Sequence, residues 1–99
     1  MVPYTELAQK KKAPAKRKHS GEVTCLVVLG GGFIATGSTD MTIKIWDDKG
    51  GKMRTELKGH IGAVLGLDCF DGEGLEARIL SCSADRTARL WEVLITACM

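Results

Sequence analysis

The sequence has no apolar run long enough to cross a membrane, and it has few aromatic residues and few prolines. Its 99 residues include two prolines, and 5% are aromatic. A membrane-spanning helix needs about 18 or more consecutive apolar residues, and no such run is present. The first apolar stretch follows a lysine-rich segment and is too short for a secretory signal. We therefore expect a chain that is not secreted and has no membrane partner, located in the cytoplasm or nucleus.

Closely spaced cysteine pairs are also lacking. The four cysteines are Cys25, Cys69, Cys82 and Cys98, and no C-x-x-C pair occurs among them. This spacing disfavours a zinc knuckle or a thioredoxin-like motif, so we predict no metal site. Without an export signal the thiols are expected to be reduced. Cys25 and Cys82 lie in apolar runs, which predicts that both are buried as small apolar residues.

Basic residues are concentrated at one end of the chain. Residues 1–18 carry a net charge of +5, whereas residues 19–99 carry −3. The basic residues of this tail are Lys10, Lys11, Lys12, Lys16, Arg17 and Lys18. We predict a disordered tail because this segment has little apolar surface to bury. It could serve as a nuclear-import signal or bind nucleic acid weakly, but it has no aromatic residues among the lysines on which bases could stack.

The remaining sequence repeats itself. Residues 36–47 and 81–92 both read [Ser/Thr]-x-Ser-x-Asp-x-Thr-x-[Lys/Arg]-[Ile/Leu]-Trp-[Asp/Glu], at an offset of 45 residues. Upstream, His-x-Gly-x-Val starts at His19 and again at His60, at an offset of 41. The second copy is therefore four residues longer in the middle, which fits the Gly-rich sequence between 71 and 76. A repeat of this length points to a repeat architecture.

Each copy has the pattern of short strands separated by Gly- and Asp-containing turns. The predicted strands are Val23–Leu29, Phe33–Thr36, Thr42–Trp46, Lys52–Leu57, Ala63–Phe70, Ala77–Ser81 and Thr87–Val93. Strands at about ten-residue spacing indicate an all-β antiparallel fold. The second copy lacks a good sequence for a fourth strand.

With Lys58-Gly59-His60, Trp46-Asp47 and Trp91-Glu92 in this spacing, the sequence resembles the WD40 repeat family of β-propellers. Two departures are mild: Lys18 precedes the first His where the family usually has Gly, and Glu92 replaces the final Asp. The resemblance implies about two antiparallel propeller blades, which is less than one closed propeller. It divides the chain into a basic tail (1–18), a first repeat (19–60) and a second repeat (61–99) that ends after its third strand.

The resemblance implies a buried hydrogen-bond chain of Trp, Ser or Thr, His and Asp in each repeat. In this sequence the eight residues are Trp46, Thr36, His19 and Asp40, then Trp91, Ser81, His60 and Asp85. The indole N–H can donate to the hydroxyl, the hydroxyl to one ring nitrogen, and the other ring nitrogen to the carboxylate. A fully satisfied network of this kind makes a blade rigid.

Two sequence patterns suggest other chemistry. Ser81, His60 and Asp85 match a hydrolase triad by residue type, but the set occurs twice and no G-x-S-x-G elbow is present. Gly30-Gly31-Gly32 after an apolar run resembles a dinucleotide fingerprint. The residues after it are poor helix formers, and they are too few for the required crossover helix. We therefore expect no enzyme activity and no cofactor, and we expect the glycines to form a turn between two strands.

The resemblance implies a non-catalytic scaffold for protein partners. Ligands of the family often bind one rim of the ring, which corresponds here to Glu22, Thr24, Thr39, Ala63, Leu65 and Ala84. Because two blades cannot close a propeller of about four to eight blades, three alternatives stay open. The chain forms a ring with further copies, docks on another propeller, or is a piece of a longer one. A rival interpretation is an RNA- or ribosome-assembly factor that acts through the basic tail.

Overall fold

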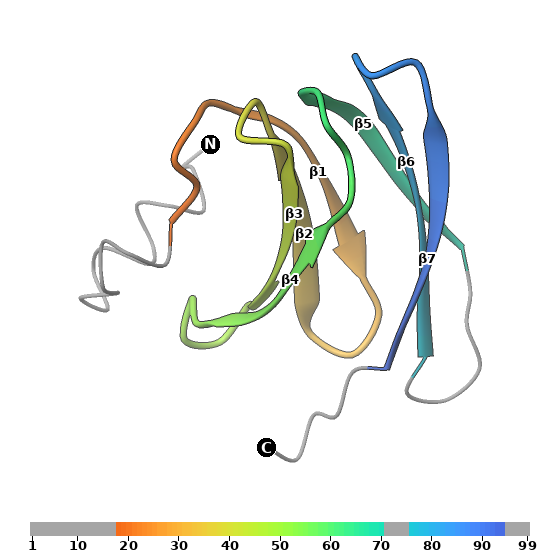
Figure 1. Cartoon of the computed structure of the whole chain (residues 1–99). Coiled ribbons are helices and arrows are strands. Elements are labelled where there is room, and N and C mark those ends of the chain that lie inside the picture. Colours follow the sequence, from red (N-terminus) through yellow and green to blue (C-terminus); the bar gives the residue numbers. More distant parts are fainter. Residues whose placement is uncertain (1–17, 71–75, 95–99) are drawn as a thin grey trace.

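The computed structural model describes residues 18–70 and 76–94. These residues form seven strands and no helix, so none of them could form a membrane-spanning helix (Figure 1). The strands are β1 (Val23–Leu29), β2 (Phe33–Ser38), β3 (Thr42–Asp47), β4 (Met53–Lys58), β5 (Val64–Phe70), β6 (Glu76–Ser83) and β7 (Ala88–Leu94). The predicted all-β fold is therefore confirmed.

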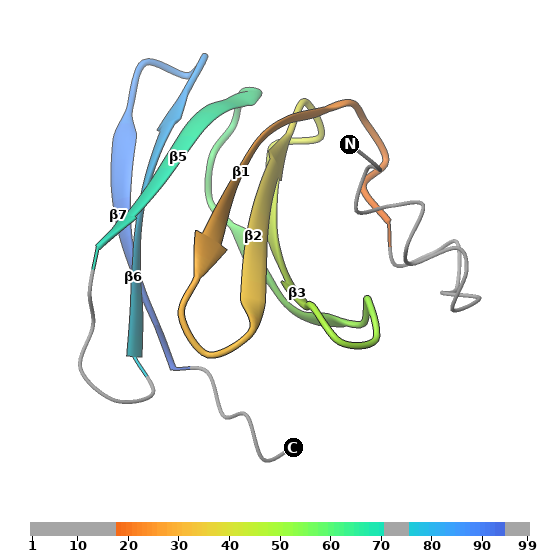
Figure 2. The same cartoon turned by 180° about the vertical axis from the view of Figure 1, so that it is seen from behind.

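The strands form two antiparallel sheets of consecutive strands. Blade 1 has the order β1-β2-β3-β4, and blade 2 has the order β5-β6-β7. All strand pairs are antiparallel. The two blades stack side by side, with the innermost strands β1 and β5 next to each other (Figure 2).

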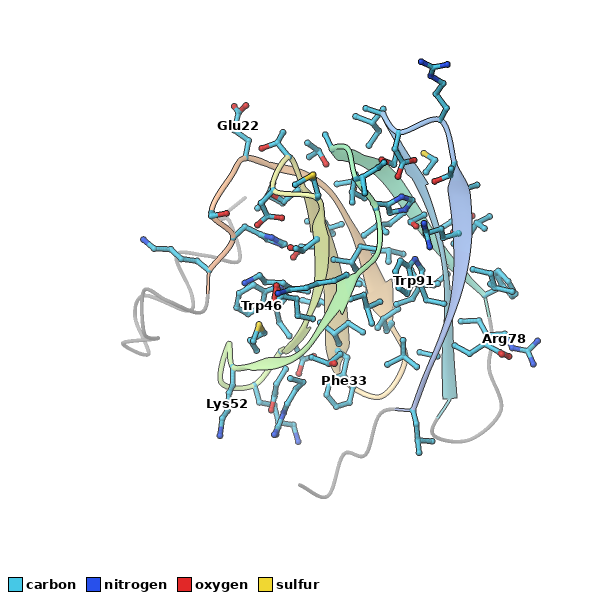
Figure 3. The ribbon with its side chains drawn as sticks, in the orientation of Figure 1. Glu22, Phe33, Trp46, Lys52, Arg78 and Trp91 are labelled. Atoms are coloured by element: carbon cyan, nitrogen blue, oxygen red, sulfur yellow. The ribbon has the colours of Figure 1, made fainter. Side chains whose placement is uncertain are left out.

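The core lies between the two blades. Ala35, Ile43 and Ile45 of blade 1 and Val64 and Ile79 of blade 2 are all 0% exposed. Because side chains alternate along a strand, only one side of each blade contributes to this core. Each blade therefore has a second side that does not face its neighbour. The side of blade 1 that carries the Trp46 ring points away from blade 2, whereas Trp91 lies between the blades (Figure 3).

A glycine allows β2 to approach blade 2 closely. A Cβ atom on Gly37 would lie 2.6 Å from Val64 Cγ1 and 2.8 Å from Cys25 Sγ. The prediction that β2 ends at Thr36 is wrong, because the strand continues through Gly37 to Ser38. Sequence propensity disfavours glycine within a strand, but Gly37 pairs with Cys25 on one side and Ile43 on the other, and its lack of a Cβ leaves room for Val64. The end of β6 was also predicted two residues too early, at Ser81 instead of Ser83, and the remaining strand ends agree to within one residue.

The turns before β3 and β7 have the same strained backbone. Met41 and Arg86, which are 45 residues apart, have φ angles of 74° and 72°. Residues with a side chain seldom adopt this left-handed region. In both turns the preceding aspartate accepts the backbone N–H of the following threonine at 2.9 Å. These bonds stabilise the turn despite the strain.

The glycine run forms the β1–β2 turn, as the sequence pattern predicted. Gly31 and Gly32 have φ angles of 77° and 86°, which glycine adopts without steric cost. The flanking strands pair antiparallel as a hairpin. A dinucleotide site of the fingerprint type needs a parallel strand pair with a helix between them, so this candidate site is excluded for Gly30–Gly32.

Two further predictions have different outcomes. Cys25 is half-buried, but Cys82 is exposed, so its predicted burial is wrong. Cys82 occupies in blade 2 the position of Gly37 in blade 1, on the side of the blade that no neighbour covers. Cys25, Cys69 and Cys82 are free thiols.

The predicted disordered tail lies outside the described residues, except for Lys18, whose carbonyl accepts a hydrogen bond from Lys44 Nζ at 3.2 Å.

Candidate functional site: two hydrogen-bond networks and two uncovered blade faces

The structure brings four predicted residues of blade 1 into one hydrogen-bonded chain. Trp46 Nε1 donates to Thr36 Oγ1 at 2.8 Å, and this hydroxyl lies 2.7 Å from His19 Nε2. His19 Nδ1 lies 2.9 Å from Asp40 Oδ2. The histidine comes from the segment before β1, the threonine from β2, the aspartate from the β2–β3 turn and the tryptophan from β3. This series of hydrogen bonds therefore links the segment before β1 to strands β2 and β3.

Blade 2 repeats this geometry. Trp91 Nε1 donates to Ser81 Oγ at 2.9 Å, Ser81 Oγ lies 2.7 Å from His60 Nε2, and His60 Nδ1 lies 2.9 Å from Asp85 Oδ2. The imidazole and indole rings meet edge to face in both blades, with centroids 6.2 Å and 6.1 Å apart. Thr36 and Ser81 therefore occupy equivalent positions, and only the hydroxyl they share is needed.

The direction of the hydrogen bonds follows from the aspartates. Burial raises the pKa of the Asp40 carboxyl. Hydrogen bonds from Thr42, His19 and the Ser20 backbone N–H together outweigh burial and lower this pKa to about 2. The pKa of Asp85 is also lowered, chiefly by the hydrogen bond from the Thr87 side chain. An ionised carboxylate only accepts, so the histidine Nδ1 donates to it. Nε2 is then the acceptor of the hydroxyl proton, and the hydroxyl oxygen accepts the indole N–H.

The distances in blade 2 match those of a hydrolase triad, but the burial of the serine does not. Ser81 is 1% exposed, and its oxygen already accepts the Trp91 N–H. A nucleophile has to reach its substrate, and this hydroxyl has no free approach. The same arrangement in blade 1 places Thr36 at the equivalent buried position. The geometry therefore suits a structural network. Within the described ranges, no three carboxylate, imidazole or thiol groups gather closely enough to hold a metal ion.

The six predicted partner-binding residues gather along one rim of the two blades. Glu22 and Thr39 are joined by backbone and side-chain hydrogen bonds of 2.9 Å, and Ala84 N donates to Ala63 O at 2.9 Å. Thr24 Oγ1 donates to the Val64 carbonyl and so bridges the two blades. All six are exposed except Ala63, which is half-buried, and Leu65 is 55% exposed. No contact of the described residues identifies a ligand at this rim.

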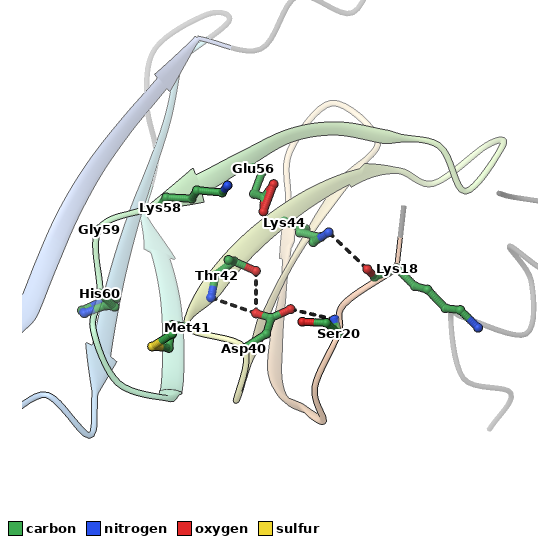
Figure 4. A pocket seen from close by; sticks show the side chains of 10 residues that line it. All are labelled: Lys18, Ser20, Asp40, Met41, Thr42, Lys44, Glu56, Lys58, Gly59 and His60. Atoms are coloured by element: carbon green, nitrogen blue, oxygen red, sulfur yellow. Dashed lines mark hydrogen bonds between the residues drawn. The ribbon is translucent and has the colours of Figure 1, made fainter. Parts of the chain in front are cut away.

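A groove of about 520 Å³ opens on the Trp46 side of blade 1 (Figure 4). It is lined by Lys18, Ser20, Asp40, Met41, Thr42, Lys44, Glu56, Lys58, Gly59 and His60. Lys44 is buried and lies opposite Glu56 in the β3–β4 register. Lys18 of the predicted basic tail belongs to this groove. The other five basic residues lie outside the described residues.

The interpretation of the sequence missed the uncovered face of blade 2. Leu80 and Leu90 lie opposite each other on β6 and β7 and are 42% and 56% exposed. The offset of 45 residues makes them equivalent to Ala35 and Ile45, which are 0% exposed beneath blade 2. We call Phe70, Leu80, Cys82 and Leu90 the free face of blade 2. The repeat alignment itself could have identified this face, because it places apolar residues where blade 1 has its core.

Blade 1 exposes the complementary side. Leu26 and Val28 of β1 are 53% and 67% exposed and share the Trp46 side of the sheet. Their equivalents in blade 2, at an offset of 41, are Leu67 and Cys69, which pack into the core between the blades. We call Leu26, Val28, Ile34 and Trp46 the Trp46 face, of which Leu26 and Val28 are exposed, whereas Ile34 is half-buried and Trp46 is 5% exposed. The chain therefore exposes apolar residues from each side of its own inter-blade interface.

Antiparallel sheets of consecutive strands that stack with their first strands innermost, each with a Trp–hydroxyl–His–Asp chain, are blades of a β-propeller. The sequence profile described as "WD domain, G-beta repeat" matches residues 13–47 and 51–92. The chain therefore belongs to the WD40 family, as the resemblance implied.

Similar proteins agree with this assignment. The chain is 42% identical over 77 residues to nuclear distribution protein PAC1-1 of Uncinocarpus reesii, an alignment that covers 75% of this chain and 17% of the relative. The structure resembles the crystal structure of the RRP9 WD40 repeats with a TM-score of 0.67 and 30% identity, over 83% of this chain and 23% of that one. It also resembles the computationally designed Ika4 protein with a TM-score of 0.64 and 26% identity, over 81% and 45%.

The chain thus spans less than a fifth of the length of the PAC1-1 relative. These similarities fit a protein-interaction module, and they do not favour the rival interpretation of an RNA- or ribosome-assembly factor that acts through its basic tail.

Proposed function

We propose that this chain is a non-catalytic scaffold that binds protein partners through its uncovered blade faces. WD40 repeat proteins are generally scaffolds of this kind, and the buried position of Ser81 leaves the Ser–His–Asp set without access to a substrate. The partners we propose are propeller blades, either in a second copy of this chain or in another WD40 protein. Support for a location in the cytoplasm or nucleus comes from the relatives named nuclear distribution proteins.

The observation that carries this proposal is the exposure of Leu80 and Leu90. Burying a leucine that is now half-exposed contributes roughly 1 kcal/mol or more to association. The face is not purely apolar, because Arg78 and Glu92 form an ion pair of 3.4 Å at its edge. An apolar centre with a polar margin is typical of protein interfaces.

The test is the molar mass in solution of the wild-type chain and two matched variants. Leu90→Lys places a charge in the free face, whereas Ile61→Lys places the same charge at a residue that is 83% exposed and lies in the loop before β5. We expect wild type and Ile61→Lys to exceed the monomer mass of 10.7 kDa as concentration rises, and Leu90→Lys to stay near it. Equal masses for the two variants would contradict docking through the free face.

A further inference from the structure

The groove on the Trp46 side of blade 1 contains a buried positive charge. Lys44 of β3 is 6% exposed, although its side chain lines this groove (Figure 4). The equivalent residue of blade 2 at the offset of 45 residues, Arg89, is exposed. Burial of a charge is costly unless the charge is paired and hydrogen-bonded. The surroundings of Lys44 therefore decide whether the groove favours an anion.

The Lys44 ammonium group has an incomplete set of partners in this chain. Its Nζ donates to the Lys18 carbonyl at 3.2 Å, which uses one of the three N–H donors of an ammonium group. Lys44 forms no ion pair with a carboxylate of the described residues. Its charge and its remaining donors are therefore not compensated by the part of the chain that the structure describes.

Two carboxylates line the groove, and neither is the counter-ion of Lys44. Asp40 accepts four hydrogen bonds, two at each oxygen, which fills the acceptor capacity of a carboxylate. Glu56 lies opposite Lys44 in the β3–β4 register and is half-buried, but the two side chains form no ion pair. In Figure 4 the Lys44 side chain lies between Glu56 and Lys18 and points to the Lys18 carbonyl. A further anion is thus needed to pair with it.

The net charge of the groove selects the kind of anion. The charged residues of its lining are three lysines and two carboxylates, namely Lys18, Lys44, Lys58, Asp40 and Glu56. With histidine neutral, they leave one net positive charge. A single carboxylate balances this charge. A phosphate group carries about −1.5 to −2 at pH 7 and would leave excess negative charge beside Asp40.

The size of the groove and its apolar part favour a peptide as the carrier of this carboxylate. The volume of about 520 Å³ lies in the range of about 300–1,000 Å³ that is typical of ligand sites. Met41 also lines the groove, and it is 44% exposed. A short peptide segment can place a carboxylate at Lys44 and an apolar side chain at Met41, whereas a small free acid makes the first contact alone.

We infer that this groove binds an acidic segment of a protein partner, with one aspartate or glutamate carboxylate as the counter-ion of Lys44. The inference rests on the scaffold function proposed above and adds the chemistry of the partner. Lys44 supplies a charge that is held in place by burial. The exposed Lys18 and Lys58 attract the acidic segment and so raise its association rate.

The first test is a titration of the full-length chain with synthetic peptides. The probe is acetyl-Gly-Leu-Glu-Leu-Gly-amide, and two control peptides have glutamine or phosphoserine in place of glutamate. NMR shifts of the Ser20 and Thr42 amides would report binding, at a protein concentration where light scattering gives the monomer mass of 10.7 kDa. We expect the glutamate peptide to bind at least tenfold more tightly than the glutamine peptide, because a charge-assisted hydrogen bond is lost with glutamine.

Equal affinities for the glutamate and glutamine peptides would overturn the inference. Tighter binding of the phosphoserine peptide than of the glutamate peptide would overturn the assignment of a carboxylate, and would identify a phosphorylated segment as the source of the anion.

Matched substitutions test whether Lys44 makes the contact. Lys44→Met removes the charge and keeps a side chain of similar length, and Lys49→Met makes the same change in the exposed β3–β4 turn. Glu56→Gln removes the neighbouring carboxylate. We expect the preference for glutamate over glutamine to disappear in Lys44→Met, to stay unchanged in Lys49→Met and to increase in Glu56→Gln. A preference that persists in Lys44→Met, with circular dichroism showing a folded chain, would contradict the contact.

The melting temperature without peptide gives an independent readout. A buried charge without a counter-ion destabilises the fold, so Lys44→Met should melt at a higher temperature than wild type. Lys49→Met should melt at the wild-type temperature, because this lysine is exposed. If Lys44→Met melts at or below the wild-type temperature, the charge is already compensated within this chain, and the inference is overturned.

Failure of this inference is distinguishable from failure of the proposed function. If Leu90→Lys abolishes association while the chain does not prefer the glutamate peptide, the scaffold function stands and the acidic partner is rejected. If the wild type stays at 10.7 kDa while the glutamate peptide binds through Lys44, self-association is rejected and the acidic contact stands.

Discussion

The hydroxyl at position 81 offers the sharpest test of the network in blade 2. Ser81→Ala removes one oxygen that accepts the Trp91 N–H and contacts His60 Nε2. Leaving a buried polar group without a partner costs roughly 1–3 kcal/mol. His60 is buried, whereas Trp91 is half-buried, so the loss of the hydrogen bond to the histidine dominates the cost. We expect the free energy of unfolding to fall by about 2–3 kcal/mol, which is a large share of the roughly 5–15 kcal/mol typical of a domain.

The matched control is Ser81→Thr, because Thr36 occupies the equivalent position in blade 1 with the same hydrogen-bond distance to histidine of 2.7 Å. The added methyl group should cost about 1 kcal/mol, the low end of the usual cost of a larger core residue, because blade 1 accommodates the same methyl group at Thr36. Urea unfolding followed by tryptophan fluorescence, at one protein concentration for all variants, measures the difference. If alanine and threonine shift the midpoint equally, the hydroxyl does not stabilise the blade, and the reasoning is refuted.

Three further predictions concern acid, packing and backbone strain. The Asp40 carboxyl has an ordinary pKa of 3.8 and a pKa of about 2 in the folded chain. Its contribution to the stability of the fold is therefore complete above pH 4 and is lost as the pH falls through 2. Melting temperatures measured from pH 5 to 2 should show this loss, and Asp40→Asn should make the melting temperature depend less on pH. Gly37→Ala should lower the melting temperature by several degrees, because the new Cβ would lie 2.6 Å from Val64 Cγ1. Gly50→Ala should leave the melting temperature unchanged, because the space around Gly50 is open. Equal effects of the two substitutions would argue against close packing at Gly37. Arg86→Gly should stabilise the chain by about 0.5–1 kcal/mol in urea unfolding, because glycine relieves the left-handed strain at a φ of 72°, and a loss of stability would contradict this.

Much of the fold could be predicted because the sequence repeats. The offset of 45 residues aligns the two Asp-containing turns and the two tryptophans, and the structure gives the turn residues Met41 and Arg86 nearly the same φ angle. Strand content followed from β-branched alternation between Gly and Asp turns. The end of β2 could not be predicted in this way, because Gly37 continues the strand by pairing with Cys25 and Ile43, where the close approach of Val64, 27 positions away in the sequence, leaves no room for a Cβ.

Burial was harder to predict than secondary structure. Cys82 and Leu90 both lie in strands with apolar residues, and the local pattern predicts burial for Cys82. Their exposure depends on whether a neighbouring blade covers that side of the sheet, which is a property of the assembly and not of the local sequence. The rim from Glu22 to Ala84 is a similar case. The structure gathers these residues, but no contact of the described residues identifies a ligand there.

The most direct test of the central claim is amide hydrogen exchange of the wild-type chain at increasing protein concentration. The account predicts that peptides covering β7 exchange more slowly as concentration rises, because a neighbouring blade then covers the free face of blade 2. Peptides covering β2, which already has a strand on both sides, should exchange at a constant rate. Exchange in β7 that is independent of concentration, in the range where the molar mass rises above 10.7 kDa, would contradict docking at this blade.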